Sequence, residues 1–359
     1  MNFGNHVSSH LDPAAPTTLP FWCSAQDMQA PLEALLSDYR DLAPPTCLRL
    51  DKPPNALEML RIVHAGRPVI FPGFTPEKAV AGSRIDWKKP EALCEVMGER
   101  KVSIAVTPNG LADALHKDEA TGKTYFVQPL TEKMSFKSFL ERLSDDTNNE
   151  VHYLQSQNGN IYRSAFDHSP DREGNGAGTA EEAPELAVLQ EHLEPEVEFV
   201  SKALGQAPDA VNLWIGDSKS ITSLHKDPYV RLLSLSQKAT LTAHNPDMKT
   251  GGVPDGQQVF PVPLMILVLM LPGYAAAFYP AATYTRSSED KASLIIQPDA
   301  EPTYPVPWVS VDPLRLPEDT PLRPIEITVE EGWTLYLPAG WYHHVMQEEG
   351  SGGICVAVN

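Results

Sequence analysis

The sequence predicts an all-β core with added helices, an α+β fold, and three observations support this class. Residues 151–157 and 325–329 alternate apolar and polar side chains, which is the period of a half-buried strand. Residues 210–216 form a further apolar, strand-like run. Helical spacing of apolar residues occurs instead near the start of the chain, over 31–39 and 55–64. We therefore expect helices to decorate the N-terminal side of a strand-built core.

The first part of the chain predicts a leader, a helix and a strand in turn. Residues 1–30 are polar and rich in proline, so we expect a flexible leader. Asn55 is placed to cap the N-terminus of the helix over 55–64. The apolar run at 68–74 ends in Pro-Gly-Phe, which predicts a strand closed by a turn. The remainder, 31–359, is expected to form a single domain.

Composition and charge limit the class of partner. The chain has 359 residues, is 42% hydrophobic and carries a net charge of −19. This is enough apolar content for a proper core. The negative charge argues against nucleic acid, whose phosphates need basic patches, and suits a basic protein partner. Residues 167–185 are acidic and Gly-rich with few apolar side chains, so we expect a surface loop there.

The cysteines and the first residues point to a reducing compartment. The four cysteines show no paired spacing, so neither a disulfide framework nor a structural zinc site is indicated: Cys23, Cys47, Cys94 and Cys355. The first 20 residues lack the basic start and apolar run of a secretory signal. The apolar run over 264–271 is eight residues, too short to span a bilayer. We expect a cytoplasmic protein that could also enter the nucleus, with no membrane partner.

One short motif organises the rest of the chain. His225 and Asp227 follow the strand-like run over 210–216 and are separated by one residue. Residues two apart on an extended strand share a face, so both can reach one ion. His343 lies far along the chain, directly after the strand-like 334–338. Two imidazoles and one carboxylate on adjacent strands form the facial triad of non-haem Fe(II) oxygenases, which leaves positions open for a co-substrate and oxygen.

Three alternatives to this metal site stay open at this point. His225 could be a hydrogen-bonded core histidine beside a surface acid. A second His-x-Asp, formed by His116 and Asp118, follows a polar stretch that is helix-like or loop, where residues two apart diverge. Of the adjacent pair His343 and His344, only one can face the metal from a strand, so His344 is an alternative ligand.

Longer strings extend the interpretation beyond the motif. They cover residues 48–54, 102–114, 209–216, 222–229 and 335–345. These strings resemble the JmjC, or cupin-like, oxygenases. The first two narrow the resemblance to the small JmjC lysyl hydroxylases that act on developmentally regulated GTP-binding proteins. The resemblance implies a double-stranded β-helix, which is a jelly-roll or cupin barrel, with its core over about 150–359 and helices packed outside.

The resemblance also implies cofactors and the residues that bind them. Fe(II) would be held by His225, Asp227 and His343, with 2-oxoglutarate as the co-substrate. The family's tyrosine at the position of Tyr153 donates its hydroxyl to a co-substrate carboxylate; an ordinary strand tyrosine is the alternative. The family's threonine at Thr222 contacts the co-substrate, although its odd spacing from the first histidine requires a bend in the strand. The implied co-substrate-binding residues are Tyr153, Asn212, Thr222, Lys238 and Asn359.

The resemblance fails over 230–282. Family members place a basic residue on a barrel strand there, where it pairs with the distal carboxylate of 2-oxoglutarate. Lys238 is the nearest candidate, but it lies about two positions early. One interpretation is that part of this segment is translated intron and not native sequence. Family members also continue past the position of Asn359 into C-terminal helices that form a dimer interface, so we expect a homodimer of that kind to lack its interface here.

The function that follows is an Fe(II)- and 2-oxoglutarate-dependent protein hydroxylase. It would hydroxylate a lysine side chain of a protein, such as a GTP-binding protein, and release succinate and CO2. A JmjC histone lysine demethylase is the first alternative, although the chain shows no zinc-finger cysteines. A catalytically impaired cupin-like binding module is favoured if 230–282 truly replaces the co-substrate strands. The third alternative is a metal-dependent cupin isomerase or dioxygenase that does not use 2-oxoglutarate.

Overall fold

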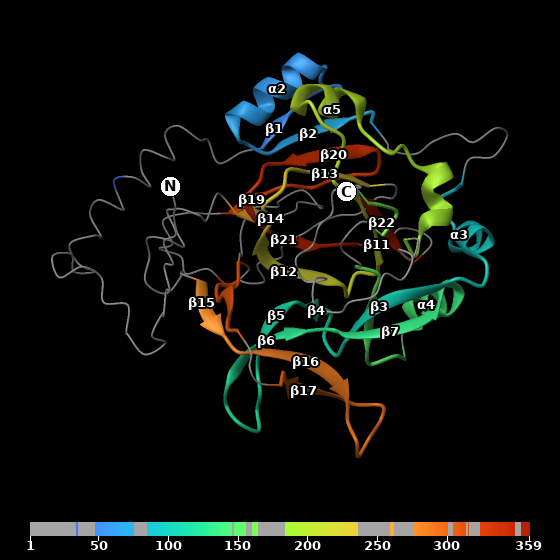
Figure 1. Ribbon diagram of the computed structural model, residues 1–359, viewed down its shortest axis with the longest axis vertical. Helices are drawn as coiled ribbons and strands as arrows, with labels where there is room; N and C mark the ends of the chain where they lie inside the picture. The colour runs from blue at the N-terminus through green and yellow to red at the C-terminus, as the bar shows by residue number, and fades with distance from the viewer. Residues whose placement is uncertain are drawn as a thin grey trace, which may run out of the picture.

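A computed structural model gives the arrangement of the chain. The structure describes residues 34, 47–74, 85–145, 147–155, 160–163, 184–235, 259–261, 276–300, 304–313, 315, 324–348 and 353–359. Strands dominate these residues, and the helices lie at the outside of the strand-built body (Figure 1).

The helical elements are short and lie mostly in the first half of the chain. They are α2 (Ala56–Ala65), α3 (Pro90–Met97), α4 (Phe136–Leu143), α5 (Glu198–Leu204) and the 3-10 helix η2 (Ala187–His192). The strands of the first half are β1 (Leu48–Arg49), β2 (Val69–Pro72), β3 (Lys101–Thr107), β4 (Leu111–Ala112), β5 (Ala114–Lys117), β6 (Thr124–Gln128), β7 (Leu130–Ser135), β8 (Val151–Tyr153) and β9 (Tyr162–Arg163). Those of the second half are β10 (Ala210–Val211), β11 (Leu213–Gly216), β12 (Ile221–Lys226), β13 (Arg231–Leu235), β14 (Val259–Pro261), β15 (Ala276–Tyr279), β16 (Ala281–Arg286), β17 (Leu294–Pro298), β18 (Val306–Val309), β19 (Pro324–Glu326), β20 (Trp333–Leu337), β21 (Tyr342–Met346) and β22 (Cys355–Val358).

A six-stranded sheet forms one wall of the molecule, in the order β1-β2-β20-β13-β22-β11. β13 lies at its centre and pairs antiparallel with both neighbours, with Arg231 opposite Leu337 and Ser234 opposite Val358. Segments far apart in the sequence are therefore adjacent in space, which is typical of a jelly roll.

The opposite wall is a three-stranded sheet in the order β21-β12-β4, with the β14–β19 pair against β21. Apolar side chains from both walls meet between them in one cluster, which includes Leu224 of β12, Tyr342 of β21, Leu335 of β20 and Ala357 of β22. Two facing sheets with a shared apolar interior confirm the predicted jelly-roll, or cupin-barrel, fold class.

The helices cover the barrel at two places (Figure 1). At one end, α2 and α5 lie side by side over β2 and β20, where Met59, Phe71 and Tyr336 are buried together. On another side, α3, α4 and η2 pack with β3 around a second apolar cluster that contains Phe139 and Ile104. Both clusters lie outside the barrel, so they stiffen it and leave its interior for other side chains.

The N-terminal predictions are confirmed where the structure describes the chain. Asn55 caps α2 in a capping box, in which its side chain accepts from Glu58 N and Glu58 reaches back to Asn55 N. The predicted strand over 68–74 is β2. The leader, nearly all of the predicted helix over 31–39 and most of the acidic segment lie outside the described residues.

Two predicted strands are shorter than expected, and one stretch that was expected to be helix or loop forms strands instead. β8 and β19 are three residues each, shorter than the alternation of 151–157 and 325–329 predicted. The stretch before His116, expected to be helix-like or loop, forms β4 and β5, because the turn at Asn109 and Gly110 returns the chain beside β12. No helix among the described residues has the length and apolarity needed to cross a bilayer.

Gly110 provides a test of how β12 is positioned. Its φ is +80°, and an added Cβ would lie 1.8 Å from the backbone oxygen of Lys219, just before β12. Gly122 has a φ of +68° with nothing within 4 Å of its Cβ position. Gly122→Ala should therefore cost only the left-handed backbone strain, about 1–2 kcal/mol. Gly110→Ala should lower the free energy of unfolding by clearly more, since it adds a backbone clash.

Urea unfolding of the two variants beside the wild-type chain measures this difference. Equal losses of stability in Gly110→Ala and Gly122→Ala would contradict the close approach of the turn to β12.

Candidate metal centre

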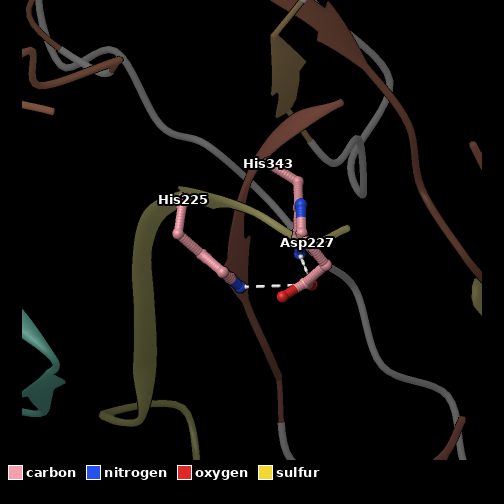
Figure 2. A group of neighbouring side chains, drawn as sticks. All are labelled: His225, Asp227 and His343. Carbon is pink, nitrogen blue, oxygen red and sulfur yellow. Dashed lines mark ion pairs between the residues drawn. The ribbon is translucent and has the colours of Figure 1, made fainter. Parts of the chain in front are cut away.

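Two antiparallel strands bring the predicted histidines together. β12 pairs with β21 so that His225 lies directly opposite His343, and their ring centroids are 4.1 Å apart. The register shifts between Thr222 and His225, so the strand carries a bulge there. This is the bend that the odd spacing of Thr222 required. Figure 2 shows both rings and the Asp227 carboxylate converging on one point.

Each histidine ring is held by its own strand. Nδ1 of His225 lies 2.8 Å from Ser223 O, and Nδ1 of His343 lies 3.1 Å from Trp341 O. A carbonyl oxygen only accepts, so each Nδ1 carries the proton and donates it. The lone pair of each Nε2 is left free and points toward Asp227, at 3.6 Å from His225 and 3.4 Å from His343. This tautomer is the one that a metal ligand needs.

Asp227 completes the group of three. Its backbone oxygen accepts from Gly340 N at 2.8 Å, which ties it to the turn before β21. One ligand atom from each of His225, Asp227 and His343 lies within 4.8 Å of the others. Oδ2 of Asp227 is buried without an aligned hydrogen-bond partner. A buried carboxylate oxygen that faces two imidazole lone pairs, with Arg231 Nε 2.7 Å away, fits a divalent transition metal, so the residues present suit Fe(II).

The charge states of these groups also suit a metal. Burial alone would raise the pKa of Asp227, but its contacts with His225, His343 and Arg231 hold that pKa well below its usual range. Burial lowers the pKa of His343 to about 4. At neutral pH the carboxylate is charged and His343 is neutral, which are the forms that bind metal.

A pocket opens from this centre into the barrel. It holds about 670 Å³ of empty space, part of it open to solvent. Its lining contains apolar side chains of β13, β20 and β22, and it also contains His225, His343 and further polar residues, among them Tyr153, Thr222, Arg231, Gln347 and Asn359. Thr222 bonds to the hydroxyl of Tyr153. Oδ1 of Asn359 accepts from Trp214 Nε1 at 2.7 Å. An apolar pocket with a few fixed polar groups is typical of a small-molecule site.

Gly216 makes room for the pocket's tyrosine. A Cβ at this position would lie 2.8 Å from Cδ2 of Tyr153 and 2.4 Å from Nε2 of Gln347. Any side chain here would displace both groups, so the missing side chain helps to set the position of Tyr153.

The other predicted residues fall into four groups. Asn212 exchanges backbone hydrogen bonds with Asn359, at 2.8 and 3.0 Å, and its own side chain is not part of the pocket lining. Lys238 lies outside the described residues, so its pairing with a carboxylate stays a prediction. His344, the alternative ligand, is buried on the other face of β21, and neither ring nitrogen has a hydrogen-bond partner. His116 and Asp118 bond to their own backbone surroundings, so the second His-x-Asp is not part of the triad.

Sequence reasoning missed two side chains near the centre. Arg231 lies with Nε 2.7 Å from Asp227 Oδ2 and lines the pocket. The signal for it was a lone basic residue at the start of an apolar strand, four positions after Asp227. Trp308 lies parallel to His225, with ring centroids 6.4 Å apart and an interplanar angle of 1°. Nothing in the local sequence of β18 indicated that contact, because it depends on how β18 crosses β12.

Comparisons with known proteins agree with this fold and site. The model of the family described as "Cupin-like domain" matches residues 54–235 and 255–359. The chain therefore belongs to the cupin-like, or JmjC, family. Within the segment 230–282, only residues 236–254 fall outside the match, and β13, which carries Arg231, falls inside it.

Three curated relatives match most of the chain. The human "Bifunctional peptidase and (3S)-lysyl hydroxylase JMJD7" is 30% identical over 92% of this chain and 91% of its own length. The Arabidopsis thaliana "Lysine-specific demethylase JMJ32" is 30% identical over 92% of this chain and 86% of its own. The Dictyostelium discoideum "JmjC domain-containing protein E" is 26% identical over 84% of this chain and 78% of its own. The printed names of the first two relatives describe enzymes that act on lysine.

Removal of a ligand should abolish metal binding. We expect the wild-type chain to retain about one Fe(II) after anaerobic loading and desalting, because three protein ligands hold it. Asp227→Ala and His343→Ala should retain almost none. Lys226→Ala is the matched control, since this exposed side chain faces away, with Nζ 5.3 Å from the Tyr342 ring centre. Colorimetric iron analysis measures the content; equal iron in all four proteins would refute the site.

Proposed function

We propose that this protein is an Fe(II)- and 2-oxoglutarate-dependent oxygenase that hydroxylates a lysine side chain of a protein. The observation that carries this proposal is the His225, Asp227 and His343 group at the mouth of an apolar pocket with a few fixed polar groups. Membership of the cupin-like family and the two relatives named for lysine chemistry support it. Fe(II) bound there with 2-oxoglutarate and oxygen would supply the oxidising power for C–H hydroxylation, with release of succinate and CO2.

Different residues of the chain would bind the metal ion and the co-substrate. The triad would hold the ion through two imidazoles and one carboxylate, which leaves positions of the ion open for a co-substrate and oxygen. Tyr153 and Thr222 share a hydrogen bond at the pocket wall and can donate hydroxyl groups to a co-substrate carboxylate. The apolar lining excludes water from the methylene carbons of the same molecule.

A dicarboxylate inside an apolar pocket also needs a cation. Burying a carboxylate without one carries a desolvation cost of several kcal/mol. Lys238 is the predicted partner of the distal carboxylate. Arg231 is a second candidate, because its guanidinium lies within the pocket and among the described lining residues it is the only Arg or Lys.

A lysine demethylase is the second candidate function. The Arabidopsis thaliana relative carries that name and is as similar to this chain as the human hydroxylase. Both reactions would use the same triad, and both would act on a cationic side chain. The net charge of −19 suits a basic protein segment in either case.

Turnover of 2-oxoglutarate tests the class of reaction. The purified chain with Fe(II), ascorbate and oxygen should convert 2-oxoglutarate to succinate, and Asp227→Ala should not. Mass spectrometry of a lysine-bearing peptide then separates the two candidates, since hydroxylation adds one oxygen and demethylation removes a methyl group as formaldehyde. A wild-type chain that binds iron but forms no succinate would favour the binding-module alternative.

The role of Tyr153 is testable by removing one hydroxyl. Tyr153→Phe should raise the 2-oxoglutarate concentration needed for half-maximal succinate formation by about tenfold, because a hydrogen bond to a charged group is lost. Tyr284→Phe is the control, since Tyr284 is also buried but belongs to a separate apolar cluster. Iron content should be unchanged in both. An unchanged requirement in Tyr153→Phe would remove Tyr153 from the co-substrate site.

A further inference from the structure

Asp113 is a carboxylate beside the metal centre that the proposed mechanism does not use. It directly follows β4, which pairs in parallel with β12 so that Ala112 lies opposite Thr222. The backbone oxygen of Asp113 accepts from Ser223 Oγ at 2.6 Å. These contacts fix Asp113 next to β12, at a position two residues before His225.

The backbone of Asp113 adopts a conformation that costs energy. Its φ is 51°, and it is the one described residue other than glycine with a positive φ. Left-handed residues other than glycine cost roughly 1–2 kcal/mol, although aspartate and asparagine tolerate the conformation best. Such conformations persist only where surrounding contacts fix them, and they concentrate at functional sites.

Few groups of the protein stabilise the charge of the Asp113 carboxylate. Gln155 Nε2 donates to its Oδ2 at 3.3 Å, and the described residues place no Lys or Arg within ion-pair distance of it. Burial raises the pKa of Asp113, while the hydrogen bond from Gln155 acts in the opposite direction. A carboxylate can accept about four hydrogen bonds, so most of its capacity is unused. Carboxylates withdrawn from water are normally paired with a cation, which here would have to come from a ligand.

Asp113 is not needed to orient the neighbouring metal ligand. A second carboxylate near a ligating histidine often accepts the proton of its outer ring nitrogen. In His225 that nitrogen, Nδ1, donates to Ser223 O at 2.8 Å, and Nε2 faces Asp227. Neither ring nitrogen of His225 therefore bonds to Asp113. The carbonyl of Ser223 already orients the ring, so Asp113 is not needed for that purpose.

Aromatic rings lie on the same flank of His225. Trp308 lies parallel to the His225 ring, and Phe126 lies 4.5 Å from Trp308 between ring centroids. Phe126 is paired with Leu115, two positions after Asp113. Trp308 and Asp113 are both only partly buried. Flat aromatic surfaces suit an alkyl chain, and their faces attract cations.

We propose that Asp113 binds the ammonium group of the target lysine, whose alkyl chain lies along Trp308. This assignment rests on the proposed function, since it takes the target to be a lysine side chain. Asp113 would then be a specificity-determining residue. It would select a side chain that ends in a cation. By holding that end in place, it would also determine which carbon of the side chain faces the metal.

The test compares two fluorescently labelled peptide pools that differ only in whether the central side chain ends in an ammonium group. Both have the same degenerate positions, without Lys or Arg, around a fixed central residue that is lysine in one pool and norleucine in the other. Binding to the full chain is measured by fluorescence anisotropy with Fe(II) and 2-oxoglutarate under anaerobic conditions. The wild-type chain should bind the lysine pool about tenfold more tightly than the norleucine pool, because one charge-assisted bond is gained.

Asp113→Asn should reduce the ratio of the affinities for the lysine and norleucine pools to about one, because the amide keeps the shape of the carboxylate but not its charge. Asparagine also tolerates the left-handed backbone, so the variant should fold. Glu119→Gln removes a charge from an exposed turn nearby and should leave the ratio unchanged. A purely structural role for Asp113 would weaken both pools equally and keep the ratio.

Two results would overturn the proposal: a wild-type chain without preference for lysine, or an Asp113→Asn variant that keeps the preference. Succinate formation without peptide, measured on the same wild-type preparation, reports the oxygenase function separately. A chain that prefers the lysine pool but forms no succinate would support the ammonium site and contradict the oxygenase assignment.

Discussion

The pairing of β12 with β21 is the constraint on which the rest of the site depends. It places His225 opposite His343, and the backbone of Asp227 is tied to Gly340 just before β21 begins. The bulge between Thr222 and His225 lets both side chains face the same pocket, which a straight strand would forbid. The opposite wall then supplies the apolar lining. Metal ligands and pocket therefore share one strand pairing.

The triad could be predicted from the sequence because residue spacing and the family resemblance point to the same side chains. A His-x-Asp on a strand and a histidine after another strand restrict three side chains to one place, once the fold class is known. Strand parity indicates only that one of His343 and His344 can face the metal. The family resemblance selects His343, and the structure groups that residue with His225 and Asp227. Resemblance supplied what parity could not, namely that the two strands are neighbours and that Thr222 turns inward.

Other features could not be read from the sequence because they depend on long-range packing. Trp308 lies parallel to His225 only because β18 lies against β12. The polar run at 110–115 indicates helix or loop, since its polarity hides that β4 lies along β12. Pairing between distant strands leaves no periodic signal in either strand alone.

The way in which the two histidines are held has a consequence for how such a protein can change over evolution. Each ring donates to a carbonyl of its own strand, two residues earlier, so no side chain from elsewhere in the fold is required to orient it. The orientation of each ring is therefore set within its own strand. Side chains elsewhere on β4, β6 and β18 can therefore change without removing the hydrogen bonds that orient the two rings. This independence is consistent with relatives of similar identity that carry the names of two different lysine chemistries.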